Sequence, residues 1–187
     1  MSLPQHIKDI IKPTSQEEQE IGSLFQREEF PKGHFLIQEG TVARHVFYIE
    51  KGLVRIYRND DSGREVTAFF MPENTFVTAL DSFYLQKPTH YNFVLLEDAV
   101  IYSMSQSDLE IMLHKSHAMA IYVFRIMFEL SGRLTELLAN IKFRTAEERY
   151  KILLQDYPFV FQRVPLHYIA SYLGITPETL SRLRAEK

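Results

Sequence analysis

The sequence has 187 residues, 45% of them hydrophobic, no cysteine, and a formal net charge of −3 at pH 7. This length and apolar content fit one domain of ordinary size plus a small one, and they exclude extensive disorder. The lack of cysteine excludes disulfides, thiolate metal sites and cysteine nucleophiles, and no apolar run approaches a membrane helix or an export signal, so we expect a cytoplasmic protein.

The first 28 residues are predicted to be helical. Ser15 and Glu18 have the spacing of a capping box, and apolar residues such as Ile21 and Leu24 recur at helical intervals. The tripeptide PKG at 31–33 ends this region.

Short apolar and aromatic runs occupy the next segment, from Phe35 to about Met104, and turns separate them. The segment NDDSG at 59–63 is the strongest turn signal, and after it Glu65, Thr67 and Phe69 alternate with Val66, Ala68 and Phe70. Several short strands at even spacing predict an antiparallel barrel or roll.

The pattern becomes helical again after the strands. A short helix begins at SQSDLEIMLHKS, capped by Ser105 or Ser107, and a longer helix follows to about Ile141. Apolar residues in the long helix recur at sequence intervals of four and three residues in turn: Val123, Met127, Leu130, Leu134, Leu137 and Ile141. We call this stripe the seam and interpret it as a dimer contact; the alternative is one side of an ordinary buried helix. Phe124 and Phe128 form a second apolar face, which we expect to cover the barrel.

Residues 142–187 form a second unit with a basic excess. Residues 140–187 contain eight Lys or Arg and five Asp or Glu. The remainder of the chain contains 13 Lys or Arg and 19 Asp or Glu. A basic tail on an acidic body weakly favours a nucleic-acid partner. Its first helix is TAEERYKILLQDYP, with Thr145 as cap, Glu148 at the capping-box position and Pro158 as the stop. VPLHYIASYLG and TPETLSRLRAEK are the next two helices.

The last two helices have the features of a helix-turn-helix. Ala170 is small where the helices would cross, Gly174 can adopt the left-handed conformation, and Thr176 can cap a helix that Pro177 begins. The predicted buried residues are Ile169, Leu173, Leu180 and Leu183, and the predicted outward ones are Pro177, Glu178, Ser181, Arg182 and Glu186 or Lys187, with Arg184 to the side. Arg suits guanine and Glu suits cytosine in a major groove. The alternative is a helical hairpin with a solvated surface.

The stretch IASYLGITPETLSRLR resembles the helix-turn-helix of the catabolite activator/Fnr-type (Crp/Fnr) transcription regulators. FLIQEGTVARHVFYIEKGLVRIY resembles the start of that family's cyclic-nucleotide-binding β-roll, with glycines at Gly40 and Gly52. The resemblance extends over nearly the whole chain. It implies an α+β protein: an antiparallel β-roll of jelly-roll type (residues 1–115), a dimerisation helix (116–141) and a DNA-binding helix-turn-helix (142–187).

The resemblance also implies roles for single residues. Glu178 and Arg182 match positions that contact bases, and Thr176 and Thr179 match positions that contact phosphate. Pro177 occupies a position where a relative has a base-contacting Arg, so the sequence preference there should differ. Members usually continue into a β-hairpin wing, whereas this sequence stops after Lys187. Either the protein lacks a wing or the sequence is a shortened one, and both alternatives imply fewer phosphate contacts.

The nucleotide pocket departs from the family pattern. By position, Thr78 and Ala79 replace a Gly-Glu pair, and His90 and Tyr91 replace the Arg-Ser pair that holds the cyclic phosphate. We therefore predict no tight binding of cyclic AMP or cyclic GMP. The alternatives are a less anionic ligand near Thr78, His90 and Tyr91, or a pocket filled by aromatic rings in a protein always competent for DNA. The rings are those of Phe76, Phe83 and Phe93. His90 and Tyr91 could also be an exposed turn and a core ring with no functional role.

Other kinds of site find little support. His114 and His117 have a spacing that suits a metal but no apparent third ligand, and no nucleophile motif or phosphate-binding loop is present. We predict a homodimeric transcription regulator of an inverted-repeat site, not an enzyme, with RNA polymerase as a further partner. The runner-up is a small-molecule-binding module with little or no DNA binding, and an enzyme on a β-roll is a remote third.

Overall fold

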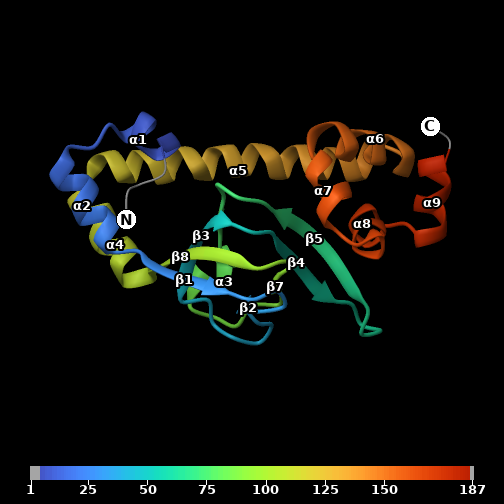
Figure 1. Cartoon of the computed structure of the whole chain (residues 1–187), viewed down its shortest axis with the longest axis horizontal. Coiled ribbons are helices and arrows are strands. Elements are labelled where there is room, and N and C mark those ends of the chain that lie inside the picture. Colours follow the sequence, from blue (N-terminus) through green and yellow to red (C-terminus); the bar gives the residue numbers. More distant parts are fainter. Residues whose placement is uncertain (1–4, 186–187) are drawn as a thin grey trace.

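The computed structural model describes residues 5–185, with side chains from Ile7 onward (Figure 1). Its strands are β1 (Gln26–Phe30), β2 (Phe35–Ile37), β3 (His45–Lys51), β4 (Val54–Asn59), β5 (Glu65–Met71), β6 (Phe76–Val77), β7 (Asn92–Leu95) and β8 (Ala99–Ser105). Its helices are α1 (Gln5–Ile11), α2 (Ser15–Ser23), α3 (Leu80–Leu85), α4 (Gln106–Lys115), α5 (His117–Phe143), α6 (Ala146–Asp156), α7 (Pro158–Arg163), α8 (Leu166–Leu173) and α9 (Pro177–Ala185).

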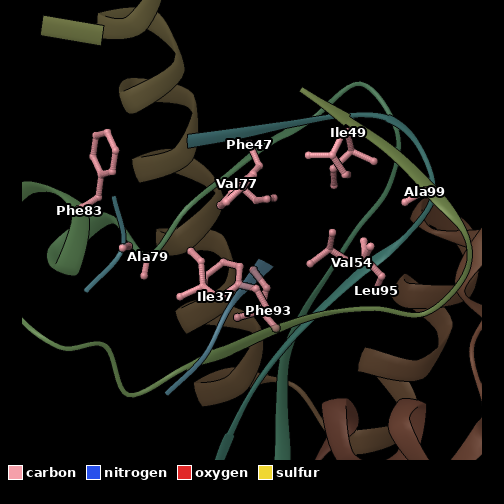
Figure 2. Close-up of a cluster of buried hydrophobic side chains, with 13 residues drawn as sticks. Ile37, Phe47, Ile49, Val54, Val77, Ala79, Phe83, Phe93, Leu95 and Ala99 are labelled. Carbon is pink, nitrogen blue, oxygen red and sulfur yellow. The ribbon is translucent and has the colours of Figure 1, made fainter. Parts of the chain in front are cut away.

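The strands form two four-stranded antiparallel sheets, in the orders β1-β8-β3-β6 and β2-β7-β4-β5, which confirms the predicted antiparallel roll. Apolar side chains from both sheets pack in the space between them, as Figure 2 shows for Ile37, Ile49 and Leu95. The predicted turn at 59–63 joins β4 to β5. There the Asp60 carboxylate accepts hydrogen bonds from the N–H groups of Ser62 and Arg64, at 2.9 and 3.0 Å.

The alternation predicted for β5 is interrupted. Ile56 pairs with Phe69 but Tyr57 pairs with Thr67, so Ala68 is an extra residue in a bulge. The bulge shifts the faces, because an inserted residue reverses the alternation that follows it. Thr67 and Phe70 are therefore both buried, and Val66 is exposed beside Glu65.

The N-terminal prediction of helix is confirmed for α1 and α2, which a short break at residues 12–14 separates, and it is wrong from Gln26 onward; residues 1–4 lie outside the described residues. The residues from Gln26 form β1, and their backbone groups are satisfied by antiparallel pairing with β8, a partner distant in the sequence. The capping box lies one residue earlier than predicted. The Thr14 hydroxyl accepts from the Glu17 N–H at 3.3 Å, and the Glu17 carboxylate accepts from the Thr14 N–H at 2.8 Å.

Helix α5 runs along the top of the roll in Figure 1 and packs against α1 and α4. Its inward face consists of Met119, Tyr122 and the half-buried Ile126. The prediction that Phe124 and Phe128 cover the barrel was wrong, because the helical repeat turns them away from that inward face. Their side chains are 62% and 65% exposed, and their rings contact each other at 4.6 Å between centroids.

The seam residues are half-buried or exposed in the single chain. The exposed ones are Met127, Leu134 and Ile141, and Ile141 is 59% exposed; Val123, Leu130 and Leu137 are half-buried. This exposure counts against the ordinary buried helix that was the alternative, since such a helix would enclose its apolar face. The dimer contact itself remains a prediction.

The C-terminal unit contains one helix more than predicted. The capping box of Thr145 and Glu148 on α6 is confirmed. Pro158 ends α6 but also begins the short helix α7, because proline suits a first helical turn, where its missing N–H costs nothing. Helices α6 to α9 enclose a core that includes Leu153, Val160 and Ile169, and Leu53 and Phe70 of the roll belong to the same cluster.

Candidate nucleic-acid interface

The turn between α8 and α9 has the predicted geometry. Gly174 adopts φ 67°, and the N–H of Ile175 donates to the carbonyl of Ala170 at 3.0 Å. These bonds satisfy carbonyls at the end of α8 and reverse the chain in a few residues. Ile169, Ala170, Leu173 and Leu180 are fully buried and Leu183 is half-buried, so all four predicted core positions and the small residue at the crossing lie in the interior.

Thr176 caps α9 as predicted. Its hydroxyl accepts from the Thr179 N–H at 3.3 Å, and its carbonyl accepts from the Leu180 N–H at 3.0 Å. Pro177 follows as the first residue of the helix, where it has no N–H to satisfy. These contacts fix where α9 begins and therefore which of its residues face outward.

The predicted DNA-contacting residues share one surface at the start of α9. Thr176, Pro177, Glu178, Ser181 and Arg182 are exposed and Thr179 is half-buried. Arg184 is also exposed, and Glu186 and Lys187 lie outside the described residues. Hydrogen bonds from its own backbone N–H and from the Thr176 side chain lower the pKa of Glu178. The Glu178 carboxylate is thus a hydrogen-bond acceptor at neutral pH, which suits cytosine in a major groove. Arg182 is a bidentate hydrogen-bond donor, which suits guanine.

The four predicted ligand residues differ in burial and in the contacts that they make. The Thr78 hydroxyl donates to the His45 carbonyl at 2.9 Å, and Ala79 is buried at the start of α3. His90 is exposed, whereas Tyr91 is half-buried against the roll core. Two surface hollows are lined by other segments, around residues 33–41 and around residues 29–31 with 98–100.

Aromatic rings fill part of the roll interior. Phe83 and Phe93 belong to the buried core of the roll, and both are labelled in Figure 2. Phe76 instead points to the opposite face of its sheet, where its ring lies 5.0 Å from that of Tyr48. Two of the three predicted rings therefore occupy the interior.

Arg55 on β4 is a buried cation that was not predicted from the sequence, and its side chain is 1% exposed. Its Nε donates to the Thr67 hydroxyl at 2.9 Å and its Nη1 to the Glu65 carboxylate. The guanidinium carbon lies 4.3 Å from the ring centroid of Tyr57 and 3.6 Å from that of Tyr168 on α8. Arg55 therefore joins the roll to the first helix of the helix-turn-helix.

A second arginine makes a similar connection from the other side. Arg163 on α7 contacts the carboxylates of Glu73 and Glu97, both on the roll. The hydrogen bond from Arg163 lowers the pKa of Glu73, and the bonds to Glu73 and Glu97 raise the pKa of Arg163. The C-terminal unit is thus attached to the roll by apolar packing and by two arginines.

No helix in residues 5–185 is both long and apolar enough to cross a membrane. Within the same residues, no three His, Cys, Asp or Glu side chains gather as ligands for a metal ion, and His114 and His117 lie in no such group.

Comparison with known proteins adds a domain assignment and a fold. Residues 27–116 match the model of the cyclic nucleotide-binding domain. No curated protein matches the sequence. Three solved structures of bacterial regulators are similar over most of their length.

The first is CLP of Xanthomonas campestris, described as a c-di-GMP-responsive global regulator, with TM-score 0.73 and 18% identity over 92% of this chain and 91% of that one. The second is FixK2 of Bradyrhizobium japonicum, with TM-score 0.74 and 18% identity over 87% and 83%. The third is a transcriptional regulator of the Crp/Fnr family from Eubacterium rectale, with TM-score 0.70 and 15% identity over 94% and 83%. Residues 27–116 are therefore a cyclic nucleotide-binding domain, and the chain as a whole has the fold of the Crp/Fnr-type transcription regulators.

Proposed function

We propose that this protein is a homodimeric transcription regulator that binds an inverted-repeat DNA site through α9, and not an enzyme. One observation carries the proposal: the capped start of α9 presents Glu178, Ser181 and Arg182 together to solvent, while its opposite face is buried. A recognition helix needs this division, because one face must be held by the protein and the other must reach base edges. Its place of action would be the cytoplasm, and a regulator that activates transcription would also contact RNA polymerase.

The dimer part of the proposal rests on α5. The seam has the spacing of a two-helix contact, and exposed apolar side chains continue to the end of the helix at Leu138, Ile141 and Phe143. Two copies joined along this stripe would be related by a two-fold axis, and each would present one α9. The target would then be an inverted repeat with half-sites about one helical turn, roughly 34 Å, apart. We assign residues 1–115 to the sensor, 116–141 to the dimer helix and 142–187 to DNA binding.

The effector proposal is that the roll does not bind cyclic AMP or cyclic GMP tightly. His90 stands where nucleotide-binding relatives have a cation, and Ala79 stands where they have a carboxylate. Thr78 already donates its hydroxyl to a backbone carbonyl, and Phe83 and Phe93 occupy interior space. These contacts favour either a less anionic ligand or a protein that binds DNA without an effector.

The competing function is a sensor module with little or no DNA binding. The match of residues 27–116 to the cyclic nucleotide-binding domain favours it, because a domain of one fold can serve different functions. Selection of bound fragments from a random DNA pool separates the two functions. We expect enrichment of one inverted repeat and binding that weakens as salt is raised. Recovery of no preferred sequence at low salt would favour the sensor module.

A further inference from the structure

The contact between the roll and α8 contains polar groups that are costly to bury. Arg55 is enclosed between Tyr57 and Tyr168, and its Nη2 has no hydrogen-bond partner among the described residues. A buried cation with an unsatisfied donor destabilises a fold unless its other contacts compensate for it. Leucine or methionine would fill the same space at lower cost. The planar stacking of the guanidinium on Tyr168 is what an apolar side chain could not provide, because only a flat cation fixes the ring beneath it in orientation.

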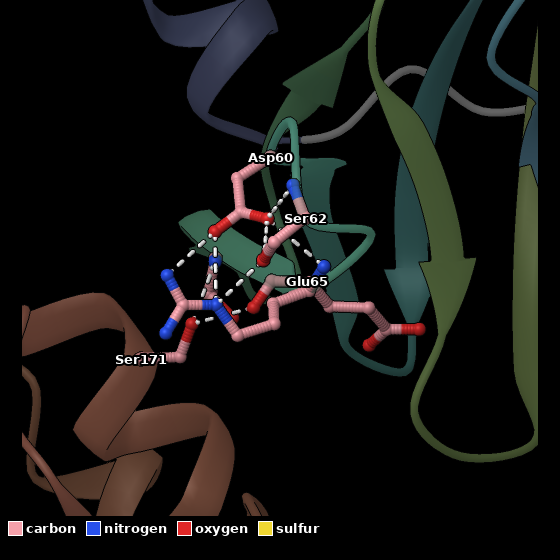
Figure 3. A network of polar contacts seen from close by, with 6 residues as sticks. Asp60, Ser62, Glu65 and Ser171 are labelled. Atoms are coloured by element: carbon pink, nitrogen blue, oxygen red, sulfur yellow. Dashed lines mark hydrogen bonds and ion pairs between the residues drawn. The ribbon is translucent and has the colours of Figure 1, made fainter.

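A second contact, at Ser171, uses the free edge of a sheet. In the sheet order β2-β7-β4-β5, no described strand pairs with the outer edge of β5. The Ser171 hydroxyl accepts from the Thr67 N–H at 3.0 Å and donates to the Glu65 carbonyl at 3.0 Å. One hydroxyl thus occupies the donor and the acceptor that a neighbouring strand would otherwise take. Figure 3 shows Ser171 reaching from α8 to the backbone of β5 beside the hairpin turn at Asp60 and Ser62.

The position of α8 determines the position of α9. The two helices share the buried side chains Ile169, Leu173 and Leu180 and are joined by the tight turn at Gly174. Hydrogen bonds are directional, so the two made by Ser171 fix the position of α8 along β5. The stacking of Arg55 on Tyr168 fixes the rotation of α8 about its own axis. The outward face of α9 is therefore oriented by residues that do not belong to it.

We propose that Arg55, Tyr168 and Ser171 form an interdomain latch that positions α9 and thereby sets the half-site spacing that the dimer accepts. This inference rests on the proposed DNA-binding function. The latch residues are positioning residues and do not contact DNA. Moving one half-site by a single base pair displaces it by about 3.4 Å and rotates it by about 35°, so a rigidly held pair of recognition helices tolerates one spacing and rejects its neighbours.

The test compares operators that differ only in the spacer between half-sites, from one base pair shorter to two longer than the selected site. The variants are Arg55→Gln, which keeps a polar side chain without the flat cation, and Ser171→Ala, which removes only the hydroxyl. Arg58→Gln is the matched control, since Arg58 is an exposed arginine on the same strand. We expect the unmodified protein and Arg58→Gln to prefer the best spacing by about tenfold or more, as expected for a rigid two-site contact.

Arg55→Gln and Ser171→Ala should reduce that preference to about threefold or less. Without these contacts the C-terminal unit could change its orientation, so that α9 could bind half-sites at several spacings with similar affinity. A merely structural role would lower affinity on all spacings in proportion, and such a result would overturn the latch. Ser171 lies at the edge of the interface, so Ser171→Ala keeps the test valid if Arg55→Gln does not fold.

A measurement without DNA separates failure of the latch from failure of the proposed function. The protein has no cysteine, so Asp61→Cys on the β4–β5 turn and Arg184→Cys on α9 introduce a single pair of spin labels. Labelled chains diluted with unlabelled ones should give one narrow distance distribution, and Arg55→Gln or Ser171→Ala should broaden it. Equal widths would overturn the latch even if DNA binding is found. If no DNA is bound, broadening would still support the latch and the regulator function alone would fail.

Discussion

Helices α8 and α9 belong to one motif but use their polar side chains in opposite ways. On α8, Tyr168 and Ser171 are engaged by the roll through a stacked arginine and two hydrogen bonds to β5. On α9, Glu178, Ser181 and Arg182 face solvent. The polar side chains of α8 thus bind the roll of the same chain, whereas those of α9 remain available to bind another molecule. The same contrast separates the inward face of α5 from its seam.

The largest expected effect comes from the open apolar surface of α5. Replacing both Leu130 and Leu134 by Asp should convert the dimer to monomers, since each fully buried apolar side chain contributes roughly 1.5–3 kcal/mol and the new charges would face each other. Sedimentation measures the change in mass. Thr135→Asp is the control, because Thr135 is exposed on the same helix but outside the seam. An unmodified protein that sediments as a monomer at micromolar concentration would contradict the proposed assembly.

The next effect concerns the interior of the roll. We expect no binding of cyclic AMP or cyclic GMP tighter than about 100 µM, because two missing charge-assisted contacts at roughly 1.5–3 kcal/mol each lower affinity by about two to four orders of magnitude. Calorimetric titration gives the dissociation constant directly. His90→Ala should leave the result unchanged, since His90 is exposed and lines neither hollow. A micromolar constant for cyclic AMP would mean that the roll is an ordinary nucleotide sensor.

The outward face of α9 gives the third effect. Arg182→Ala should cost about 1–3 kcal/mol on the best DNA site and relax the preference at one base pair. Lys187→Ala should weaken binding to all sequences alike, as expected of a phosphate contact. Competition binding with single-base variants of the selected site distinguishes these outcomes. Equal losses on specific and random DNA for Arg182→Ala would assign that side chain to phosphate instead.

Local signals predicted much of this architecture. The cap at Thr145, the left-handed Gly174 and the short runs that became strands all depend on neighbours a few residues away. The errors have non-local causes. Residues from Gln26 became a strand because β8, more than 70 residues later, offered an edge. Phe124 and Phe128 turned outward because the packing of α1 and α4 selected a different face of α5.

The residues of the candidate functional surface also divide into those predictable from local sequence and those that depend on distant contacts. The outward residues of α9 were predictable from helical periodicity alone, whereas Arg55 was not. The burial of Arg55 could have been inferred from the run from Leu53 to Tyr57. This run lacks the alternation of polar and apolar residues that is typical of a strand with one solvent-exposed face. Such a run indicates a strand covered on both sides, and an arginine within it must then be enclosed. Its partner Tyr168 lies more than 100 residues away, so no local pattern could have identified the contact.

The smallest expected effect tests the closed interface at Arg163. Its hydrogen bond lowers the pKa of Glu73 below the ordinary value of 4.5. A lowered carboxyl pKa adds stability that is fully present above about pH 4.5 and is lost as the pH falls through the folded-state value. Thermal unfolding of the unmodified protein and of Glu73→Gln should therefore differ most near neutral pH and converge in acid.

The difference should be at most about 1 kcal/mol, because Arg163, Glu73 and Glu97 remain a quarter to a third exposed and water screens them. Glu147→Gln is the control, since it removes an exposed pair with Lys151 that does not join the roll to the C-terminal unit. Glu97 also accepts hydrogen bonds from the Arg163 guanidinium, so part of the contact survives in the Glu73→Gln variant. A gap that stays constant down to pH 3 would mean that ionisation of Glu73 does not contribute. The unit would then be held by Arg55, by the hydrogen bonds of Ser171 to β5 and by the apolar packing of Leu53 and Phe70.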